Sequence, residues 1–337
     1  AKVLMKLRRE SFACVTRPVY WALAVYTPDT PAQLAEALAQ CAAEHKSFEI
    51  AGHRTKVRLG GPIRGEVRIS TEKLNRVVDY NAADLTISVE AGLPYAELVR
   101  IVAEKNQMVA LDPPFGGQAT VGGVIASNGS GPRRRWHGTA RDVVIGMHVA
   151  GVDGILVQSG GMVVKNVAGL DLGKLHIGAL GTLGAVAVVN FKLLPLPVAT
   201  RTFVASRETP GDIIAVRDKL LESILQPLAV DLLNPAAAAR VGLKGYCLLV
   251  EAGGNAALLD RYQRELADYT VVDDGIWRKV AGFTESFLAE HAEGCVVRIS
   301  TQLRELGTVL EKFNGPLVAR AANGVSYAYC ERPPQFM

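Results

Sequence analysis

Three glycine-rich clusters in the first half of the chain could together hold a large anionic ligand. The first covers residues 52–56 (GHRTK), the second residues 112–131 and the third residues 162–197. Glycine lets a backbone approach a ligand closely, with amide groups free to donate to its oxygens. Each cluster alone would pass as an ordinary turn region. Three separated clusters, with hydroxyl and lysine donors beside the glycines, favour a dinucleotide over a mononucleotide.

The dinucleotide fingerprint G-x-G-x-x-G does not follow the first strand of this sequence. A Rossmann-type site therefore has no direct support. The first cluster does follow a predicted strand at residues 47–51, and it carries the cations Arg54 and Lys56. These features indicate a phosphate-binding loop outside the Rossmann class.

Composition is typical of a compact chain with room for two domains. The sequence has 337 residues, of which 49% are hydrophobic and 21% charged, with a net charge of +4. These values exclude a disordered chain. The basic run at residues 133–135 is typical of a solvated or phosphate-facing loop, so nucleic-acid binding is not expected. No transmembrane segment is expected, because no apolar run reaches ~18 residues. A signal peptide is not expected either, because residues 1–25 have no continuous apolar region followed by a small-residue cleavage site.

The cysteines are odd in number and widely spaced, with no C-x-x-C pair. Neither an iron–sulfur cluster nor a structural zinc is indicated, and no metal site is expected. Reduced thiols in a cytoplasmic protein are the simplest interpretation. They are Cys14, Cys41, Cys247, Cys295 and Cys330.

Helices and strands are expected to position the clusters. A helix begins after Thr30, where Thr30, Pro31 and Gln33 form a capping box. A second amphipathic helix covers residues 95–106 and a short one residues 171–177. Strands are predicted at 47–51, 66–69, 76–80, 85–90 and 185–194, with a hairpin of 143–152 and 155–158.

The run 193–197 is the predicted domain boundary, because its two prolines end the preceding strand. We expect an N-terminal extension (1–26), a first domain (27–197) and a second domain (198–337). The second domain is predicted to be an α+β layer with a mostly antiparallel sheet. Its expected helices cover 211–225, 255–269, 276–291 and 302–313, and its expected strands cover 201–206, 228–233, 246–251, 295–300, 316–321 and 326–330.

The order of these segments resembles the flavin-binding domain of the vanillyl-alcohol-oxidase/PCMH superfamily, over about residues 27–200. The family's TIGG turn matches residues 120–123, and its arginine- and glycine-rich run matches residues 131–146. The motif KNVAGYDLxKLxxGxLGTLG matches residues 165–184 almost throughout. Within the superfamily, the chain resembles the FAD-binding E subunits of bacterial glycolate oxidases.

The resemblance implies an α+β fold: a PCMH-type FAD-binding domain of two subdomains, followed by a smaller α+β cap domain. It also implies FAD as cofactor, with the pyrophosphate near Thr55, Thr120, Gly122 and Gly123 and the adenosine end near residues 181–186. No catalytic residue is assigned. The cofactor-binding residues expected are Gly52, His53, Arg54, Thr55, Lys56, Pro113, Ala119, Thr120, Gly122, Gly123, Ser127, Asn128, Lys165, Gly169, Gly181, Gly184 and Val186.

Two departures from the family pattern affect this site. The family has glycines where this chain has His53 and Arg54, and a side chain at positive φ costs roughly 1 kcal/mol. Either the loop takes another path, or the two side chains replace backbone contacts to the pyrophosphate. The family tyrosine of the third cluster is Leu170 here, which removes a hydroxyl.

Two histidines lie in the motif regions. Some relatives attach FAD covalently through a histidine in the first loop, but His53 is one position away from it, so non-covalent FAD is expected. His137 could face the flavin. Beyond residue 200 the sequence has a single histidine, His291, and no metal-ligand spacing. Relatives that oxidise 2-hydroxy acids alone carry such a set there.

The resemblance therefore predicts the FAD-binding subunit of a glycolate, or similar 2-hydroxy-acid, oxidase or dehydrogenase complex. Its partners would be a second flavin subunit and an iron–sulfur subunit, to which the flavin passes electrons. Such an FAD-dependent oxidoreductase would be a poor catalyst alone, and cytoplasmic or attached to the membrane through its partners. A stand-alone FAD oxidoreductase of unknown substrate and a structural subunit that has lost FAD remain as alternatives.

Overall fold

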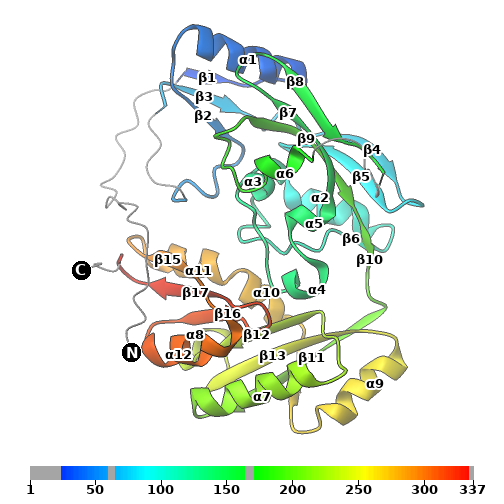
Figure 1. The fold of residues 1–337 in the computed structure, drawn as a ribbon, viewed down its shortest axis with the longest axis vertical. Helices are drawn as coiled ribbons and strands as arrows, with labels where there is room; N and C mark the ends of the chain where they lie inside the picture. Colours follow the sequence, from blue (N-terminus) through cyan, green and yellow to red (C-terminus); the bar gives the residue numbers. More distant parts are fainter. Residues whose placement is uncertain (1–23, 60–64, 164–170, 334–337) are drawn as a thin grey trace.

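A computed structural model of the chain describes residues 24–59, 65–163 and 171–333. Two α+β domains lie one above the other, joined where β10 (Leu194–Pro195) leads into β11 (Ala199–Arg207) (Figure 1). This agrees with the fold class expected from the sequence. No helix within the described ranges is long and apolar enough to cross a membrane.

The first subdomain is a parallel sheet covered by one helix. The sheet has the order β1 (Ala24–Tyr26), β3 (Val67–Ser70), β2 (Phe48–Ala51). Its strand β1 lies before residue 27, where the sequence predicts the start of the first domain. The helix α1 (Pro31–Ala43) begins at the predicted cap, where Thr30 Oγ1 accepts from the Gln33 amide at 3.2 Å. Apolar residues of α1 such as Leu34 and Leu38 are fully buried against the sheets.

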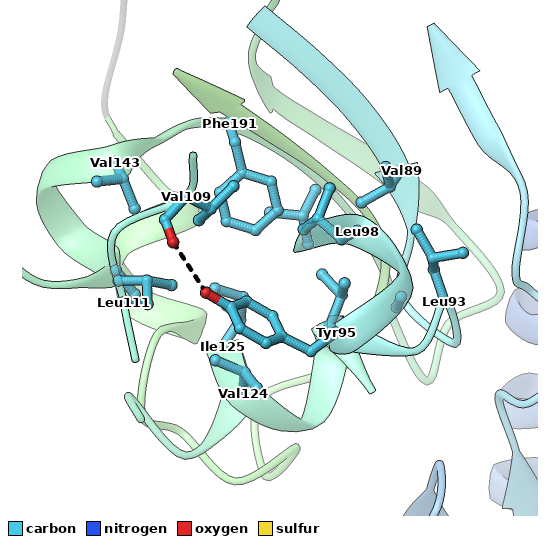
Figure 2. Packing of buried hydrophobic residues seen from close by; sticks show 14 of the residues in the cluster. Val89, Leu93, Tyr95, Leu98, Val109, Leu111, Val124, Ile125, Val143 and Phe191 are labelled. Atoms are coloured by element: carbon cyan, nitrogen blue, oxygen red, sulfur yellow. Dashed lines mark hydrogen bonds between the residues drawn. The ribbon is translucent and has the colours of Figure 1, made fainter. Parts of the chain in front are cut away.

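The second subdomain is an antiparallel sheet packed against α2 (Tyr95–Ala103) and α3 (Val121–Ala126). Tyr95 lies inside this core, and its hydroxyl donates to the Val109 carbonyl at 3.1 Å (Figure 2). Short helices α4 (Arg134–His137), α5 (Ala140–Val143) and α6 (Gly173–His176) connect the strands. The sheet order is β4 (Val77–Asn81), β5 (Thr86–Glu90), β9 (Ala185–Lys192), β7 (Val144–Ala150), β8 (Leu156–Gly160), and β6 (Gln107–Met108) pairs separately with β10 (Leu194–Pro195).

The cap domain is an antiparallel sheet with helices on both faces. One face packs against α7 (Pro210–Glu222), α9 (Ala256–Glu265) and α12 (Leu306–Lys312). The other packs against α8 (Pro235–Val241), α10 (Ile276–Ala281) and α11 (Phe283–Glu290). The strand order is β14 (Thr270–Val272), β11 (Ala199–Arg207), β13 (Tyr246–Gly254), β12 (Ala229–Leu233), β16 (Leu317–Arg320), β17 (Val325–Cys330), β15 (Cys295–Ser300).

All four predicted helices of this domain differ in length or continuity, and the helix expected at 211–225 ends at Glu222. The helix expected at 276–291 is two helices, because Gly282 interrupts it between α10 and α11. The helix expected at 302–313 begins as a 3₁₀ turn, η1 (Leu303–Glu305). The helix expected at 255–269 ends at Glu265. The four described cysteines, Cys41, Cys247, Cys295 and Cys330, are free thiols.

Candidate functional site

The first two glycine clusters pack directly against each other. A Cβ added to Gly52 would lie 2.4 Å from Thr120 Oγ1, so only glycine allows this approach. The ring nitrogen His53 Nδ1 lies 2.7 Å from the Gln118 carbonyl oxygen. The loop that follows β2 is therefore fixed to the segment that precedes α3.

The third cluster meets the other two around α3. The amide of Gly178 donates to Ile125 O at 3.1 Å, and that of Leu180 donates to Ala126 O at 2.9 Å. Gly181 has φ +77° and lies beside Ile50, the penultimate residue of β2. Three segments that are far apart in the sequence thus converge at the end of β2.

The structure of the first loop shows how it accommodates His53 and Arg54, which stand where the family has glycines. Arg54 has φ +54°, so an arginine occupies a left-handed conformation that glycine adopts at lower cost. Its Nε donates to Glu49 Oε1 at 2.9 Å, which holds the side chain against the protein. The imidazole of His53 and the guanidinium of Arg54 thus both contact protein atoms. The backbone at Arg54 keeps its left-handed conformation although the residue is not a glycine.

The amides near Thr120 are already bonded within the protein. Gly122 N donates to Ala91 O at 2.6 Å, and Gly123 N donates to Thr120 Oγ1 at 3.3 Å, which caps α3. By contrast, the described part of the chain offers no acceptor to the backbone amides of His53 and Thr55. The first loop, more than the Gly122–Gly123 turn, therefore has free donors for a phosphate.

Two buried polar atoms of these loops have no hydrogen-bond partner among the described residues, Lys56 Nζ and Asn128 Oδ1. A buried polar group without a partner costs about 1–3 kcal/mol, so each is expected to contact a polar ligand. Burial lowers the pKa of Lys56 to about 8, although the carboxylate of Glu285 opposes this shift. Together with the glycine approach at Gly52, these atoms fit a large polar cofactor such as FAD.

The remaining predicted residues of the second cluster lie close by. Ala119 is buried, Pro113 accepts from the Gly116 amide through its carbonyl, and Ser127 Oγ donates to Gly123 O at 2.7 Å. His137 Nε2 is another buried atom without a partner in the described ranges, and burial lowers the pKa of His137.

The end of the third cluster belongs to the sheet. Gly184 packs against β7, where an added Cβ would lie 2.9 Å from Val149 Cγ1. Val186 is on β9 in the core of the second subdomain. Lys165 and Gly169, which the motif match singled out, lie outside the described residues.

The cap domain contacts the cofactor loops through residues that the sequence analysis did not select. Phe115 N donates to Glu285 Oε1 of α11, and Arg58 Nη2 donates to the Gly294 carbonyl. No sequence signal marks Glu285, which is one carboxylate on an amphipathic helix 170 residues from Phe115. Helices α4 and α11 lie between the two domains (Figure 1).

An ion-pair cluster forms a second link between the domains. Arg133 donates to both oxygens of Glu251 on β13 at 3.2 Å, and its Nη1 lies 3.5 Å from Asp112 Oδ1. Burial raises the pKa of Glu251, and the hydrogen bonds from Arg133 oppose this shift. Burial lowers the pKa of Arg133, but the carboxylates of Asp112 and Glu251 outweigh it and the net shift is upward.

Comparisons with known proteins point to an FAD-binding domain. The model of the FAD binding domain family matches residues 22–160, which is less than half of the chain. This part of the chain is therefore similar to the FAD-binding domains of that family. Among the described residues, no group of three or more histidine, cysteine, aspartate or glutamate side chains could hold a metal ion.

Curated relatives match between half and three fifths of the chain. Glycolate oxidase subunit GlcE of Escherichia coli is 34% identical over 50% of this chain and 48% of its own length. Glycolate oxidase subunit GlcD of Bacillus subtilis is 31% identical over 60% and 46%. A mitochondrial D-lactate dehydrogenase [cytochrome] of Saccharomyces cerevisiae is 32% identical over 54% and 30%. The matched region thus spans half or less of each of these relatives.

Solved structures share the fold of nearly the whole chain. An alkyldihydroxyacetonephosphate synthase superposes with a TM-score of 0.73 at 15% identity, over 90% of this chain and 66% of its own. The 4-ethylphenol oxidase of Gulosibacter chungangensis superposes with a TM-score of 0.69 at 13% identity, over 91% and 74%. The two-domain PCMH-type architecture is therefore the fold of this chain.

Proposed function

We propose that this chain binds FAD non-covalently and is the FAD-binding subunit of a complex that oxidises a small 2-hydroxy acid. The family match at residues 22–160 supports the cofactor. The glycolate oxidase and D-lactate dehydrogenase relatives support the substrate class. The observation that carries the proposal is the convergence of three glycine clusters beside the unpartnered Oδ1 atom of Asn128.

Each cluster has its own part in this proposal. The amides of His53 and Thr55 donate to the pyrophosphate, and the turn at Gly181 holds the adenosine end. Bound FAD supplies the acceptor for the electrons of the acid. The contact between Phe115 and Glu285 closes the cap over the loops and limits the access of water.

The proposed complex contains a second flavin subunit and an iron–sulfur subunit, and the flavin of this chain passes electrons to the latter. The likeness to two different glycolate oxidase subunits supports this organisation. The complex would work in the cytoplasm, or at the membrane surface through its partners.

The absorbance spectrum of the purified chain tests the cofactor. We expect a yellow protein that releases intact FAD on treatment with acid or heat. FMN, which lacks the adenosine end, should raise the melting temperature less than FAD does. A colourless chain that takes up no FAD at micromolar concentrations would support the structural-subunit alternative, and FAD attached to a His53 peptide would contradict the non-covalent link.

Flavin reduction by glycolate or D-lactate tests the need for partners. In the isolated chain we expect slow bleaching of the flavin absorbance, which added partner subunits accelerate. Rapid bleaching in the isolated chain would contradict the subunit proposal and favour the stand-alone oxidoreductase.

A further inference from the structure

Two half-buried charged side chains, one from each domain, meet at the cofactor loops. Lys56 follows the first cluster directly, and its Nζ lies 6.0 Å from the centroid of the Phe115 ring. Glu285 of α11 accepts from the backbone amide of the same Phe115. Phe115 is therefore the common neighbour that brings the ammonium and the carboxylate to one small area.

Each of the two side chains has a free hydrogen-bonding position. Lys56 Nζ is buried without an acceptor, and Glu285 Oε2 is buried without a donor, as far as the described residues extend. Glu285 Oε1 is already used by Phe115. The area thus offers a cationic donor and, beside it, an anionic acceptor.

This combination matches one kind of small molecule better than others. A 2-hydroxy acid carries a carboxylate and a hydroxyl on adjacent carbons, so it needs a cationic donor next to a hydrogen-bond acceptor. A phosphate of the cofactor would suit Lys56, but Glu285 would repel its negative charges. A 2-hydroxy acid is also an anion, but its hydroxyl donates a hydrogen bond to Glu285 that offsets the repulsion.

We propose that Lys56 and Glu285 form the binding site for the small 2-hydroxy acid at the domain interface. Lys56 Nζ donates to the acid's carboxylate, and Glu285 Oε2 accepts from its hydroxyl. This assignment rests on the proposed function for the identity of the acid, but the two residues can be tested without turnover.

The probe is 2-hydroxyisobutyrate, which has both groups but no hydrogen on the carbinol carbon and cannot be oxidised to a 2-oxo acid. Isobutyrate, which lacks the hydroxyl, is its matched comparison. Isothermal titration calorimetry of the full FAD-loaded chain should give about tenfold tighter binding of 2-hydroxyisobutyrate, because a hydrogen bond to a charged group is gained. Equal affinities for the two acids would overturn the role of Glu285.

Substitution of the lysine gives the second test. Lys56→Met, loaded with FAD before the titration, should weaken binding of 2-hydroxyisobutyrate at least tenfold. Lys105→Met, at an exposed lysine after α2, is the control and should not change the affinity. Unchanged acid binding in FAD-loaded Lys56→Met would overturn the proposal, and so would a variant that cannot be loaded with FAD, because the lysine would then serve the cofactor.

Substitution of the glutamate tests the hydroxyl contact. Glu285→Ala should reduce the preference for 2-hydroxyisobutyrate over isobutyrate to about threefold or less, and Glu285→Gln, which keeps an acceptor oxygen, should restore part of it. Glu293→Ala, at an exposed glutamate, is the matched control. A preference that survives in Glu285→Ala would overturn the assignment.

The pH profile adds a readout that a structural role would not change. Glu285 is the charged group that acts on Lys56 among the described residues, and the pKa of Lys56 is about 8. Since only the protonated lysine binds a carboxylate, affinity should fall as the pH rises through about 8. A flat profile between pH 7 and about 10 would contradict the proposal.

The two proposals fail in different ways. A chain that takes up no FAD but binds 2-hydroxyisobutyrate through Lys56 would overturn the proposed function and support this site. A chain that holds FAD but binds the acid equally well without Lys56 would overturn only this site.

Discussion

Arg54 illustrates how a single residue can keep a backbone shape that its type does not favour. Its φ of +54° lies in the left-handed region, which costs a non-glycine residue roughly 1–2 kcal/mol. The contact with Glu49, itself buried and also bound by Arg68 at 3.2 Å, offsets part of this cost. The loop thus depends on side-chain contacts where family members depend on glycine.

Two substitutions at this residue separate backbone strain from lost contacts. Arg54→Gly and Arg54→Val both remove the side-chain contacts, but only valine is branched at Cβ and resists positive φ. Arg54→Val should therefore be less stable than Arg54→Gly by at least about 1 kcal/mol. Urea unfolding of the two variants measures the difference, and equal stabilities would mean that the loop relaxes to negative φ.

Individual site residues were predictable only where a motif contains them. Lys56 was selected because it ends a recognisable phosphate loop. Glu285 and Glu251 were missed, because a carboxylate on a helix or strand gives no signal of what it will face after folding. The free amides of the first loop, and the bonded state of Gly122, also depend on neighbours distant in sequence.

At the scale of elements, a buried ion pair joins two neighbouring strands of the cap sheet. Asp231 of β12 and Arg320 of β16 face each other in paired positions and form a hydrogen-bonded ion pair. Asp231 is fully buried and Arg320 is 7% exposed. The Arg320 guanidinium also lies 5.4 Å from the ring of Tyr327.

Removing one partner of this pair should cost more than removing both. Arg320→Met leaves a buried carboxylate without its cation and should lower the free energy of unfolding by about 3–5 kcal/mol. The double variant Asp231→Asn/Arg320→Met should recover most of this loss. Chemical denaturation measures both, with the exposed Arg304→Met as control. If the double variant is as unstable as the single one, the loss is due to packing and not to charge.

Elements were predictable where local patterns agree with the fold. The N-cap of α1 at Thr30 follows from its capping residues. The strands of the cap domain follow from alternating apolar and polar residues. The helix α3 was not expected, since two of its six residues are glycines of poor helix propensity. It forms because Thr120 caps it and because Gly122 packs closely on Ala91, contacts that a local pattern does not contain.

For the whole molecule, the contact between domains is held by charge as well as by packing. Arg133 belongs to the FAD-binding domain and Glu251, which is 3% exposed, to the cap. Since Glu251 is buried and Arg133 half-buried at the interface, we expect the position of the cap over the cofactor loops to depend on this pair.

Substitution of this pair should loosen the two domains. Arg133→Met leaves Glu251 buried and unpaired, and Glu251→Gln weakens the same contact, so their effects should be coupled by about 1–3 kcal/mol. We also expect faster proteolysis in the connection at 196–198, where Val198 is 88% exposed. Additive effects on the free energy of unfolding, with unchanged proteolysis, would mean that the ion pair does not hold the cap.

The two-domain architecture was predictable because its motifs and strand patterns are local. The completion of the polar site by the cap was not, because it requires the relative position of the domains. Substrate residues were expected among histidines and metal ligands, whereas in the structure Lys56 and Glu285 meet from the two domains at Phe115.

The position of β9 has a consequence for biosynthesis. This strand is the last of the five-stranded sheet in the sequence, yet it lies between β5 and β7. During translation, β5 and β7 do not pair with each other. One edge of each strand therefore stays unpaired until residues 185–192 leave the ribosome. Non-local strand pairing of this kind slows folding and leaves unpaired strand edges that favour aggregation. We therefore expect the nascent first domain to bind chaperones until its central strand has been synthesised.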